Sequence, residues 1–172
     1  MKFEIKEANT EDISLINRII QNVWQQMPYK DWFAPDDEQI LQNLLQYNNG
    51  TIWKAVVDNT NIIAGFLIVT YPGLDSENLG YDISLSKDKL SQVAHMDTIV
   101  VLPDYRGHRL QQKLTTYAES ILKEKGFKYL MCTIHPNNVY SLNNMQKCGY
   151  KVILEKLKYG GLPRCILLKE IT

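Results

Sequence analysis

The sequence predicts one mixed α/β domain that spans residues 1–172, with a largely antiparallel sheet and one pair of parallel strands. Apolar runs of strand length and amphipathic runs of helical length follow the order β-α-α-β-β, a polar connection, then β-α-β-α-β-β. The parallel pair is expected to be joined through the central helix, between the strands at 94–102 and 128–134. The length of 172 residues is sufficient for a sizeable core.

The N-terminal half predicts two helices and three strands. The first strand covers residues 3–6, and the first helix presents an apolar face from Ile13 to Val23 behind capping residues at 9–12. Residues 24–35, WQQMPYKDWFAP, are aromatic and irregular, and the second helix begins at 36–38 and ends near 48–50. Residues 51–57 and 62–70 predict antiparallel strands around a turn at 58–61. The long connection 71–92 contains a short element at 79–82.

The other elements are organised around residues 92–125. The strand at 94–102 ends at Pro103, a basic turn follows, and the helix at 110–125 carries one apolar face and ends before Gly126. A strand at 128–134 and a helix at 138–149, capped by Asn138, come next. Strands at 152–159 and 164–169 close the sheet around a turn at 160–163.

The turn before the central helix has the properties of an anion-binding site. The first backbone N–H groups of a helix have no internal acceptor, and the helix dipole adds positive potential there. Arg106, His108 and Arg109 place basic groups at the same end, and Gly107 allows the backbone to approach a ligand closely. A phosphate or diphosphate suits this turn. The alternative is a basic turn that only connects a strand to a helix.

Two motifs resemble the GNAT superfamily of N-acetyltransferases. Residues 100–114, VVLPDYRGHRLQQKL, resemble its acyl-CoA-binding segment, whose loop is usually written Arg/Gln-x-x-Gly-x-Gly/Ala. Arg106 and Gly107 fit this loop, whereas Arg109 and Gln111 replace the usual middle Gly and the usual Gly or Ala. Residues 133–141, TIHPNNVYS, and 147–150, KCGY, resemble the family's later strand, helix start and helix end. The two motifs stand in the family's order and at its usual separation. Together with the pattern of the N-terminal half, the resemblance covers nearly the whole chain.

The resemblance implies a GNAT-like fold and an acetyl-CoA site. In that fold a twisted, mostly antiparallel sheet is flanked by about four helices, and the two parallel strands splay apart around the pantetheine arm. The first two helices and their connection line the acceptor side, which would place Trp24, Tyr29, Trp32 and Phe33 there; the alternative is that these aromatic residues belong to the core. The cofactor-binding residues it implies are Ile99, Val100, Val101, Arg106, Gly107, His108, Arg109, Leu110, Gln111, Asn138 and Ser141.

The activity implied is transfer of an acetyl group from acetyl-CoA to an amine by direct attack in a ternary complex. Such a site must align both reactants, accept a proton from the amine and stabilise the oxyanion that develops. No covalent enzyme intermediate is needed, so Cys132 and Cys148 are interpreted as structural residues rather than nucleophiles. We expect no metal ion.

The catalytic candidates are Asp97 and His95, which strict strand alternation places on one face, together with Ile99 and Val101. Histidine titrates near neutral pH and can accept the amine proton, directly or through water. Asp97 can do the same or bind a cationic acceptor. The alternative is a polar strand start that faces solvent.

The position of the usual GNAT general acid, a tyrosine four residues before the Gly of the helix end, is occupied by Met145. Tyr140 lies more than one turn earlier and is a weak substitute, so no acid is assigned. Two alternatives follow: a CoA-binding module of the same fold without catalysis, and a phosphate- or nucleotide-binding protein. The latter lacks support from a GxxxxGK[ST] segment or from clustered metal ligands.

Charge and cysteine usage define the expected setting. Lys and Arg total 19 and Asp and Glu total 19, so no net field favours nucleic acid or an anionic membrane. Three cysteines indicate reduced thiols, and no apolar signal core is present near the N-terminus. We therefore expect a cytoplasmic monomer or homodimer whose partner is a small-molecule or peptide amine.

Overall fold

The computed structural model of the protein describes residues 1–172 and shows a single twisted sheet with helices on both faces. The sheet has seven strands in the order β1-β2-β3-β4-β5-β7-β6, and every neighbouring pair is antiparallel except β4 and β5. The mixed fold predicted from the sequence is confirmed. No helix combines the length and apolarity that crossing a bilayer requires.

The strands are β1 Phe3–Glu7, β2 Gly50–Val57, β3 Ile63–Thr70, β4 Val93–Val101, β5 Tyr129–Ile134, β6 Lys151–Lys158 and β7 Leu162–Glu170. The α-helices are α1 Ile13–Gln26, α2 Glu38–Gln46, α3 Lys87–Leu90, α4 Leu110–Glu124 and α5 Val139–Lys147. The 3-10 turns are η1 Thr10–Asp12, η2 Lys30–Trp32, η3 Leu79–Ile83 and η4 Pro103–Tyr105.

These bounds correct three details of the sequence analysis. Helix α1 continues to Gln26, into the segment expected to be irregular, and α3 forms inside the connection expected at 86–92. The helix α3 is the fifth where about four were expected. Strand β7 begins at Leu162, inside the expected turn, because its first residues pair with the end of β6.

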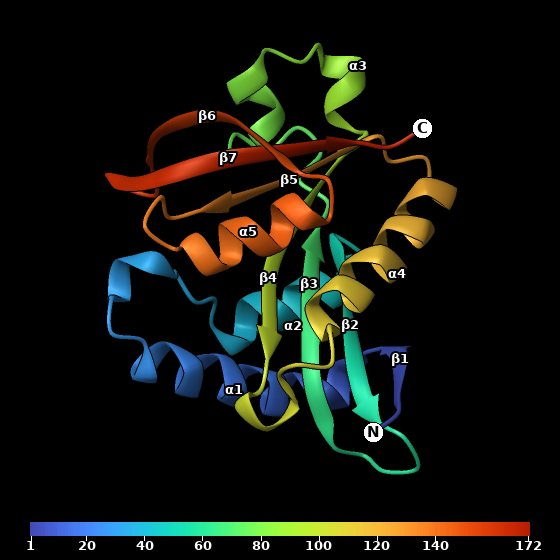
Figure 1. The fold of residues 1–172 in the computed structure, drawn as a ribbon. Coiled ribbons are helices and arrows are strands. Elements are labelled where there is room, and N and C mark those ends of the chain that lie inside the picture. Colours follow the sequence, from blue (N-terminus) through green and yellow to red (C-terminus); the bar gives the residue numbers. More distant parts are fainter.

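Two separate cores hold the helices to the sheet. Helix α4 covers the front face in Figure 1 and packs its buried face on β2, β3 and β4, while α1 and α2 cover the opposite face. Side chains that alternate along β3 supply both cores: Leu67 and Val69 pack under α4, and Phe66 and Ile68 pack under α1 and α2. Gly65 allows β3 to lie close to β4, since a Cβ there would come within 2.6 Å of the Val100 carbonyl oxygen.

The parallel strands β4 and β5 pair only at their beginnings. Their register joins Val93 to Tyr129 and His95 to Met131, and beyond these residues no pairing continues. Figure 1 shows the two strands diverging, with α5 in front of the opening. One edge of β4, from Met96 to Val101, is therefore left without a strand partner, and its backbone groups are open to a ligand.

A bulge changes the direction of side chains at the same point. Thr98 pairs with Ile68 and Met96 pairs with Val69, so Asp97 is an extra residue in β4 with no partner in β3. The strict alternation expected for β4 is therefore wrong beyond Met96.

The packing on either side of the bulge shows this reversal. Ile99 and Val101 pack in the α4 core together with Ala94, whereas Val100 packs in the core under α1 and α2. Period-2 counting had placed Ile99 and Ala94 on opposite faces.

Candidate active site

The turn that precedes α4 presents a row of free backbone donors. The N–H groups of residues 107–112 have no backbone or side-chain acceptor within the protein; the next N–H group, that of Lys113, donates to the Arg109 carbonyl oxygen at 3.0 Å. Gly107 has φ of 81° and Arg109 has φ of 58°, so both adopt the left-handed conformation. This backbone turns successive N–H groups toward one side, which is the geometry of an anion site.

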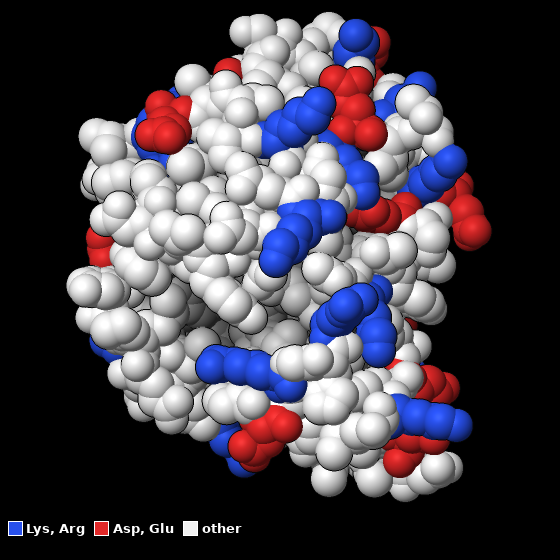
Figure 2. Space-filling view, viewed as in Figure 1, with Lys and Arg blue, Asp and Glu red and all other residues white.

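A groove with a volume of about 620 Å³ lies in front of these donors. Its cationic lining residues are Arg106, Arg109 and Lys147, and no carboxylate lines it. Figure 2 shows Lys and Arg side chains on both sides of the hollow below α5. The groove therefore combines free N–H donors, a helix N-terminus and positive side chains, which suits a phosphorylated ligand.

Most of the predicted cofactor-binding residues line this groove. They are Ile99, Val100, Val101, Arg106, Gly107, Arg109, Leu110, Gln111 and Ser141. His108 does not line it: Nδ1 of His108 lies 3.1 Å from the Arg106 carbonyl oxygen, and its ring packs edge-on against Phe3 at 5.3 Å. Asn138 lies in the neighbouring cavity and accepts a hydrogen bond from the Ser141 N–H at 3.3 Å, which caps α5.

The sequence analysis did not include five further lining residues of the groove among the cofactor-binding residues. They are Tyr105, Gln112, Tyr140, Asn144 and Lys147. Asn144 of α5 donates a hydrogen bond from Nδ2 to Oε1 of Gln111 on α4 at 3.0 Å. This bond joins the two walls of the groove. The helical spacing of Tyr140, Asn144 and Lys147 on α5 was the available signal, since these residues recur on one face.

A second cavity, of about 190 Å³, occupies the opening between β4 and β5. It shares with the groove the residues Val23, Ile99, Val100, Gln111 and Ser141, so the two spaces adjoin. The residues that line only the second cavity are Met27, Trp32, Phe33, Met96, Asp97, Thr98, Cys132, Thr133, Ile134, Asn138 and Met145. A ligand held in the groove can therefore extend between the strands and meet a second ligand here.

The segment between α1 and α2 closes one side of this second cavity. Met27, Trp32 and Phe33 of this segment line the cavity. Arg164 of β7 donates to the Asp31 carbonyl oxygen at 2.8 Å, and the Trp32 ring stacks on the ring of His135 at 5.7 Å. Trp32 and Phe33 thus reach the predicted acceptor side, whereas Trp24 and Tyr29 do not line it.

Asp97 lies in the second cavity at the bulge. Asp97 is exposed on the surface of the strand, so solvent reaches its side chain through the cavity that it lines. Burial raises the pKa of Asp97 to about 7; the negative charge of Asp36 adds to the rise, and a hydrogen bond from Thr98 at 3.4 Å opposes it. Asp97 is therefore partly protonated at neutral pH and is a stronger base than an ordinary aspartate.

His95 lies outside the second cavity and is already engaged. Its Nε2 accepts a hydrogen bond from the Leu79 N–H of η3 at 3.0 Å. Burial, assisted by the charge of Lys158, lowers the pKa of His95 to about 4 against the opposing influence of Asp75 and Asp82. The lone pair that a general base needs is used to hold η3 on the sheet, so the structure does not bring His95 and Asp97 together in one site.

Besides Met27 and Met96, two sulfur-containing residues line only the second cavity: Cys132 and Met145, neither of which is expected to exchange a proton with a substrate. Burial raises the pKa of Cys132 to about 12, with a further contribution from Asp97, so this thiol stays protonated. Met145 is 2% exposed and lies at the wall of the second cavity. Its thioether cannot donate a proton. Tyr140 is 73% exposed on the groove side, away from this point.

Comparison with known proteins places the chain among acetyltransferases. The family whose sequence model matches is described as the Acetyltransferase (GNAT) family, over residues 17–150. No curated protein matches the chain by sequence.

Among solved structures, an N-acetyltransferase from Staphylococcus aureus Mu50 is 17% identical, with a TM-score of 0.72 and 99% of each chain covered. Arabidopsis thaliana NAA60 in complex with acetyl-CoA is 12% identical, with a TM-score of 0.76 and 99% of each chain covered. The Salmonella typhimurium protein yncA with its cofactor acetyl-CoA is 14% identical, with a TM-score of 0.72, 99% of this chain and 94% of that chain covered. At these identities the likeness shows a shared fold.

Proposed function

The chain belongs to the GNAT acetyltransferase family, and we propose that it transfers an acetyl group from acetyl-CoA to an amine in a ternary complex. The observation that carries this proposal is that two spaces adjoin: a basic groove in front of α4 shares lining residues with a cavity between β4 and β5 that Asp97 lines. One space suits the diphosphate and the other suits a reacting thioester and amine. We propose that residues 1–172 act as a single domain.

The residues present fit acetyl-CoA. The free N–H groups of residues 107–112 and the side chains of Arg106 and Arg109 would bind the diphosphate. The unpaired edge of β4, from Met96 to Val101, would bind the pantetheine arm as an added strand binds a sheet edge. Acetyl-CoA supplies an activated thioester, so the protein has only to align the reactants, remove a proton and stabilise charge.

We propose Asp97 as the group that receives the amine proton. A carboxylate with a pKa near neutrality matches the role of a general base that operates near pH 7. The acceptor would enter past Trp32 and Phe33 and place its nitrogen between Asp97 and the thioester. The proton would then move to Asp97, directly or through one water molecule. His95 remains a weaker candidate because its Nε2 already accepts a hydrogen bond.

The departing thiolate needs no strong acid, because a thiol has a pKa of about 8.5. Ser141 lines both the groove and the second cavity. Its hydroxyl could donate a hydrogen bond to the departing thiolate sulfur of CoA. This arrangement accommodates Met145 in the position where the family usually has tyrosine. The same methionine also supports one rival function, a CoA-binding module without catalysis.

The proposal is tested by CoA release from acetyl-CoA in the presence of a panel of small-molecule and peptide amines. We expect turnover that depends on both the amine and the protein. Acetyl-CoA at about 100 times its dissociation constant should add roughly 2.7 kcal/mol of stability, whereas ATP should not. Stabilisation without turnover for any amine would favour the non-catalytic module. No melting shift at millimolar acetyl-CoA would refute both.

A further inference from the structure

Two pairs of threonine and tyrosine side chains in this protein share a hydrogen bond between their hydroxyl groups. The Thr51 and Tyr71 oxygens lie 2.7 Å apart, and the Thr133 and Tyr159 oxygens lie 3.0 Å apart. Thr51 is 3% exposed in β2 and lines neither the groove nor the second cavity. Thr133 of β5 lines the second cavity. The first pair therefore satisfies a buried hydroxyl, whereas the second places a hydroxyl where the reactants would meet.

Thr133 and Asp97 lie on the same face of the sheet, the face opposite α4. The neighbours of Thr133 in β5, Cys132 and Ile134, pack in the α4 core, so strand alternation directs Thr133 to the other face. Asp97 accepts a hydrogen bond from Thr98, which pairs in β3 with a residue of the core under α1 and α2. The second cavity thus has a carboxylate from β4 and a hydroxyl from β5, the two strands that diverge around it.

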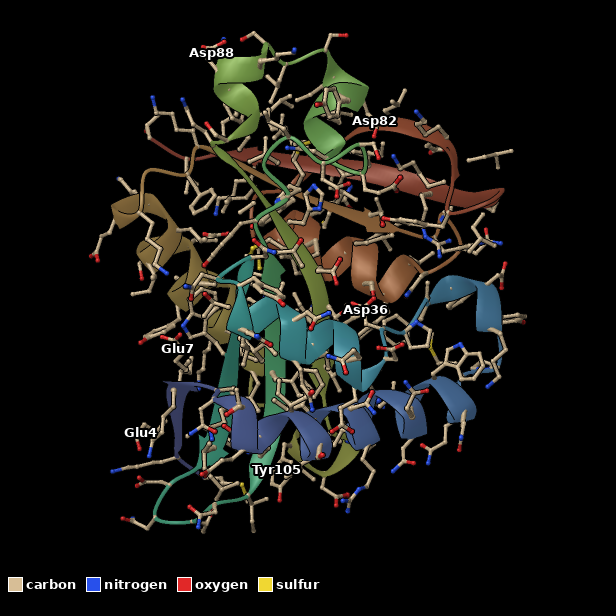
Figure 3. The ribbon with its side chains drawn as sticks, turned by 180° about the vertical axis from the view of Figure 1, so that it is seen from behind. Glu4, Glu7, Asp36, Asp82, Asp88 and Tyr105 are labelled. Carbon is tan, nitrogen blue, oxygen red and sulfur yellow. The ribbon has the colours of Figure 1, made fainter.

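Tyr159 adopts an unusual backbone conformation at the turn between β6 and β7. Tyr159 and Gly160 are the central residues of this turn, in which the Gly161 N–H donates to the Lys158 carbonyl oxygen at 3.1 Å. Tyr159 has φ of 53°, at a position where such turns usually have Asn, Asp or Gly. Asp82 of η3 binds Lys158 at 2.9 Å, and Figure 3 shows Asp82 beside this hairpin, at the opposite end of the molecule from α1. A bulky residue held in the left-handed region indicates a role for its side chain.

The side chain of Tyr159 is held in position from a second direction. The guanidinium of Arg164 lies 5.6 Å from the centre of the Tyr159 ring, and Arg164 also donates to the Asp31 carbonyl oxygen at 2.8 Å. Tyr159 and the wall of the second cavity therefore share one anchor. Burial raises the pKa of Tyr159 against the opposing hydrogen bond with Thr133, so the phenol stays protonated at neutral pH and can donate.

The hydroxyl of Thr133 has hydrogen-bonding capacity that the protein does not use. A threonine hydroxyl has one donor and two acceptor lone pairs. The bond with Tyr159 occupies one of these positions, and the Thr133 hydroxyl forms no other hydrogen bond with the protein. When Tyr159 donates, one lone pair of Thr133 remains available to a ligand in the second cavity.

We propose that the Thr133 hydroxyl accepts a hydrogen bond from the nitrogen of the reacting amine and that Tyr159 orients this hydroxyl. The inference rests on the proposed function and adds to the same site a residue that contacts the acceptor and a residue that positions it. One N–H of the amine points to Asp97 and the other points to Thr133. Two fixed N–H directions aim the nitrogen lone pair at the thioester carbon.

Asp97 and Thr133 have different tasks in the transfer. The nitrogen lone pair forms the C–N bond, the C–S bond breaks with its electrons leaving on the CoA sulfur, and Asp97 takes the proton from nitrogen. The nitrogen carries positive charge until that proton leaves, and during this time its hydrogen bond to Thr133 is charge-assisted. Thr133 therefore stabilises the transition state more than it stabilises the bound amine, and its removal should lower kcat.

The test is steady-state kinetics with acetyl-CoA and benzylamine, an amine whose apolar ring suits the mostly apolar lining of the second cavity. Thr133→Val keeps the shape of the side chain and should lower kcat about tenfold to 100-fold, with the affinity for CoA unchanged. Thr133→Ser keeps the hydroxyl and should retain most of the activity. Tyr159→Phe keeps the ring beside Arg164 and should lower kcat about threefold to tenfold.

Combining the two substitutions distinguishes positioning from a separate effect. If Tyr159 acts through Thr133, the variant with both Thr133→Val and Tyr159→Phe should be no slower than Thr133→Val alone. Losses that add would overturn the role of Tyr159. A kcat of Thr133→Val within about twofold of the unmodified protein would overturn the role of Thr133, since a lost charge-assisted bond costs more.

The matched control is Tyr71→Phe, which removes the same kind of hydrogen bond from Thr51. This variant should keep kcat unchanged, and thermal melts of all variants show that each is folded. A loss of kcat in Tyr71→Phe equal to that in Tyr159→Phe would mean that the second pair, like the first, only contributes to stability.

A binding measurement separates this inference from the proposed function. The probe is a bisubstrate compound in which benzylamine is joined to the CoA sulfur through an acetyl linker, so its amide N–H takes the place of the amine and no turnover is needed. Calorimetric titration should show that Thr133→Val binds the probe about threefold to tenfold more weakly and binds CoA equally well.

The two measurements together assign each failure. Weaker binding of the probe to Thr133→Val, without acetyl transfer by the unmodified protein, would support the site and refute the proposed function. Transfer that Thr133→Val does not slow, with unchanged binding of the probe, would support the proposed function and refute the site. No transfer and no difference in binding would refute both.

Discussion

The groove before α4 and the cavity between β4 and β5 are adjoining spaces with different construction. The groove depends mainly on backbone N–H groups of one continuous segment, residues 107–112. The cavity gathers side chains from α1, the α1–α2 connection, β4, β5 and α5. The groove is thus defined by local conformation, while the cavity is defined by tertiary packing.

This difference indicates which changes each space tolerates. A backbone site should resist side-chain replacement as long as the turn keeps its conformation, and Arg109, where the family usually has glycine, keeps the left-handed conformation with φ of 58°. A side-chain site changes its specificity with single substitutions. The predictions below test whether cofactor binding and acceptor chemistry can be altered separately.

The largest expected effect is a loss of turnover, without a loss of CoA binding, when Asp97 is replaced. Asp97→Asn keeps the size of the side chain and removes its charge and basicity. If Asp97 accepts the amine proton, kcat should fall by roughly 100-fold to 10,000-fold while the affinity for CoA changes little. Steady-state kinetics and calorimetric titration of CoA measure the two quantities on the same variant.

The matched control for Asp97 is His95→Gln. Glutamine can still accept from the Leu79 N–H, so kcat should stay within about tenfold of the unmodified protein. A rise in the acceptor KM with kcat preserved in Asp97→Asn would show that Asp97 binds the acceptor instead. Unchanged kinetics in both variants would place the base outside β4.

The second effect disrupts the groove and leaves the acceptor cavity intact. Gly107→Pro removes a backbone donor and fixes φ near −65°, whereas the turn requires φ of 81° at this position. We expect the stabilisation by acetyl-CoA, roughly 2.7 kcal/mol at about 100 times the dissociation constant, to disappear. Thermal melts with and without acetyl-CoA measure it.

Two further variants control this result. Gly107→Ala keeps the donor, and a Cβ at this position would contact no other atom, so its cost is only the strain of the left-handed conformation, about 1 kcal/mol. Arg109→Ala removes one side chain and keeps the backbone donors. If Arg109→Ala weakened binding more than Gly107→Pro, the guanidinium would have to make the main phosphate contact.

The sequence predicted the groove far better than the acceptor cavity. The strand, basic turn and helix of residues 93–124 are contiguous, so periodicity and residue type were sufficient to predict them. The bulge at Asp97 was not predicted, because the two-residue periodicity of a strand contains no sign of an inserted residue. Only the pairing of β4 with β3 reveals it. For that reason His95 and Asp97 were grouped on one face.

The acceptor wall could not be predicted for a different reason. Trp32 reaches the cavity because Arg164 holds the Asp31 carbonyl oxygen and His135 stacks on the Trp32 ring, and both partners come from distant strands or their ends. Such contacts are decided by tertiary packing, and nothing in the local pattern WQQMPYKDWFAP distinguishes a cavity wall from an ordinary core residue.

A smaller expected effect is a pH dependence of the free energy of unfolding that comes from the raised pKa of Asp97. The titratable groups whose charges couple to that of Asp97 are Asp36 before α2, Cys132 on β5 and Tyr159 after β6. In the unfolded chain Asp97 should titrate near its ordinary pKa of about 3.9, whereas in the folded protein its pKa is about 7. Between these values the unfolded chain releases a proton that the folded protein retains, so the free energy of unfolding falls as pH rises.

Asp97→Asn removes this dependence. Its melting temperature should exceed that of the unmodified protein at pH about 8, and the difference should shrink as the pH falls toward about 3, where Asp97 is protonated in the folded protein and mostly protonated in the unfolded chain. Thermal melts of the two proteins at each pH measure the difference. An equal difference at both pH values would mean that burial does not raise the pKa of Asp97.

The smallest expected effect concerns Arg109, where the groove tolerates a side chain that the family usually lacks. Arg109→Gly relieves the strain of a left-handed non-glycine residue, about 1 kcal/mol, and adds a similar entropy cost in the unfolded chain, so stability without ligand should change little. The loss of one positive charge near the diphosphate should raise the dissociation constant of CoA about threefold to tenfold at low ionic strength. Because this contribution is screened, the difference should shrink when salt is raised to about 1 M. Calorimetric titration at two salt concentrations measures it. Tighter binding of CoA to Arg109→Gly would mean that the arginine side chain restricts the groove, and a difference that persists at high salt would assign Arg109 a contact shielded from solvent.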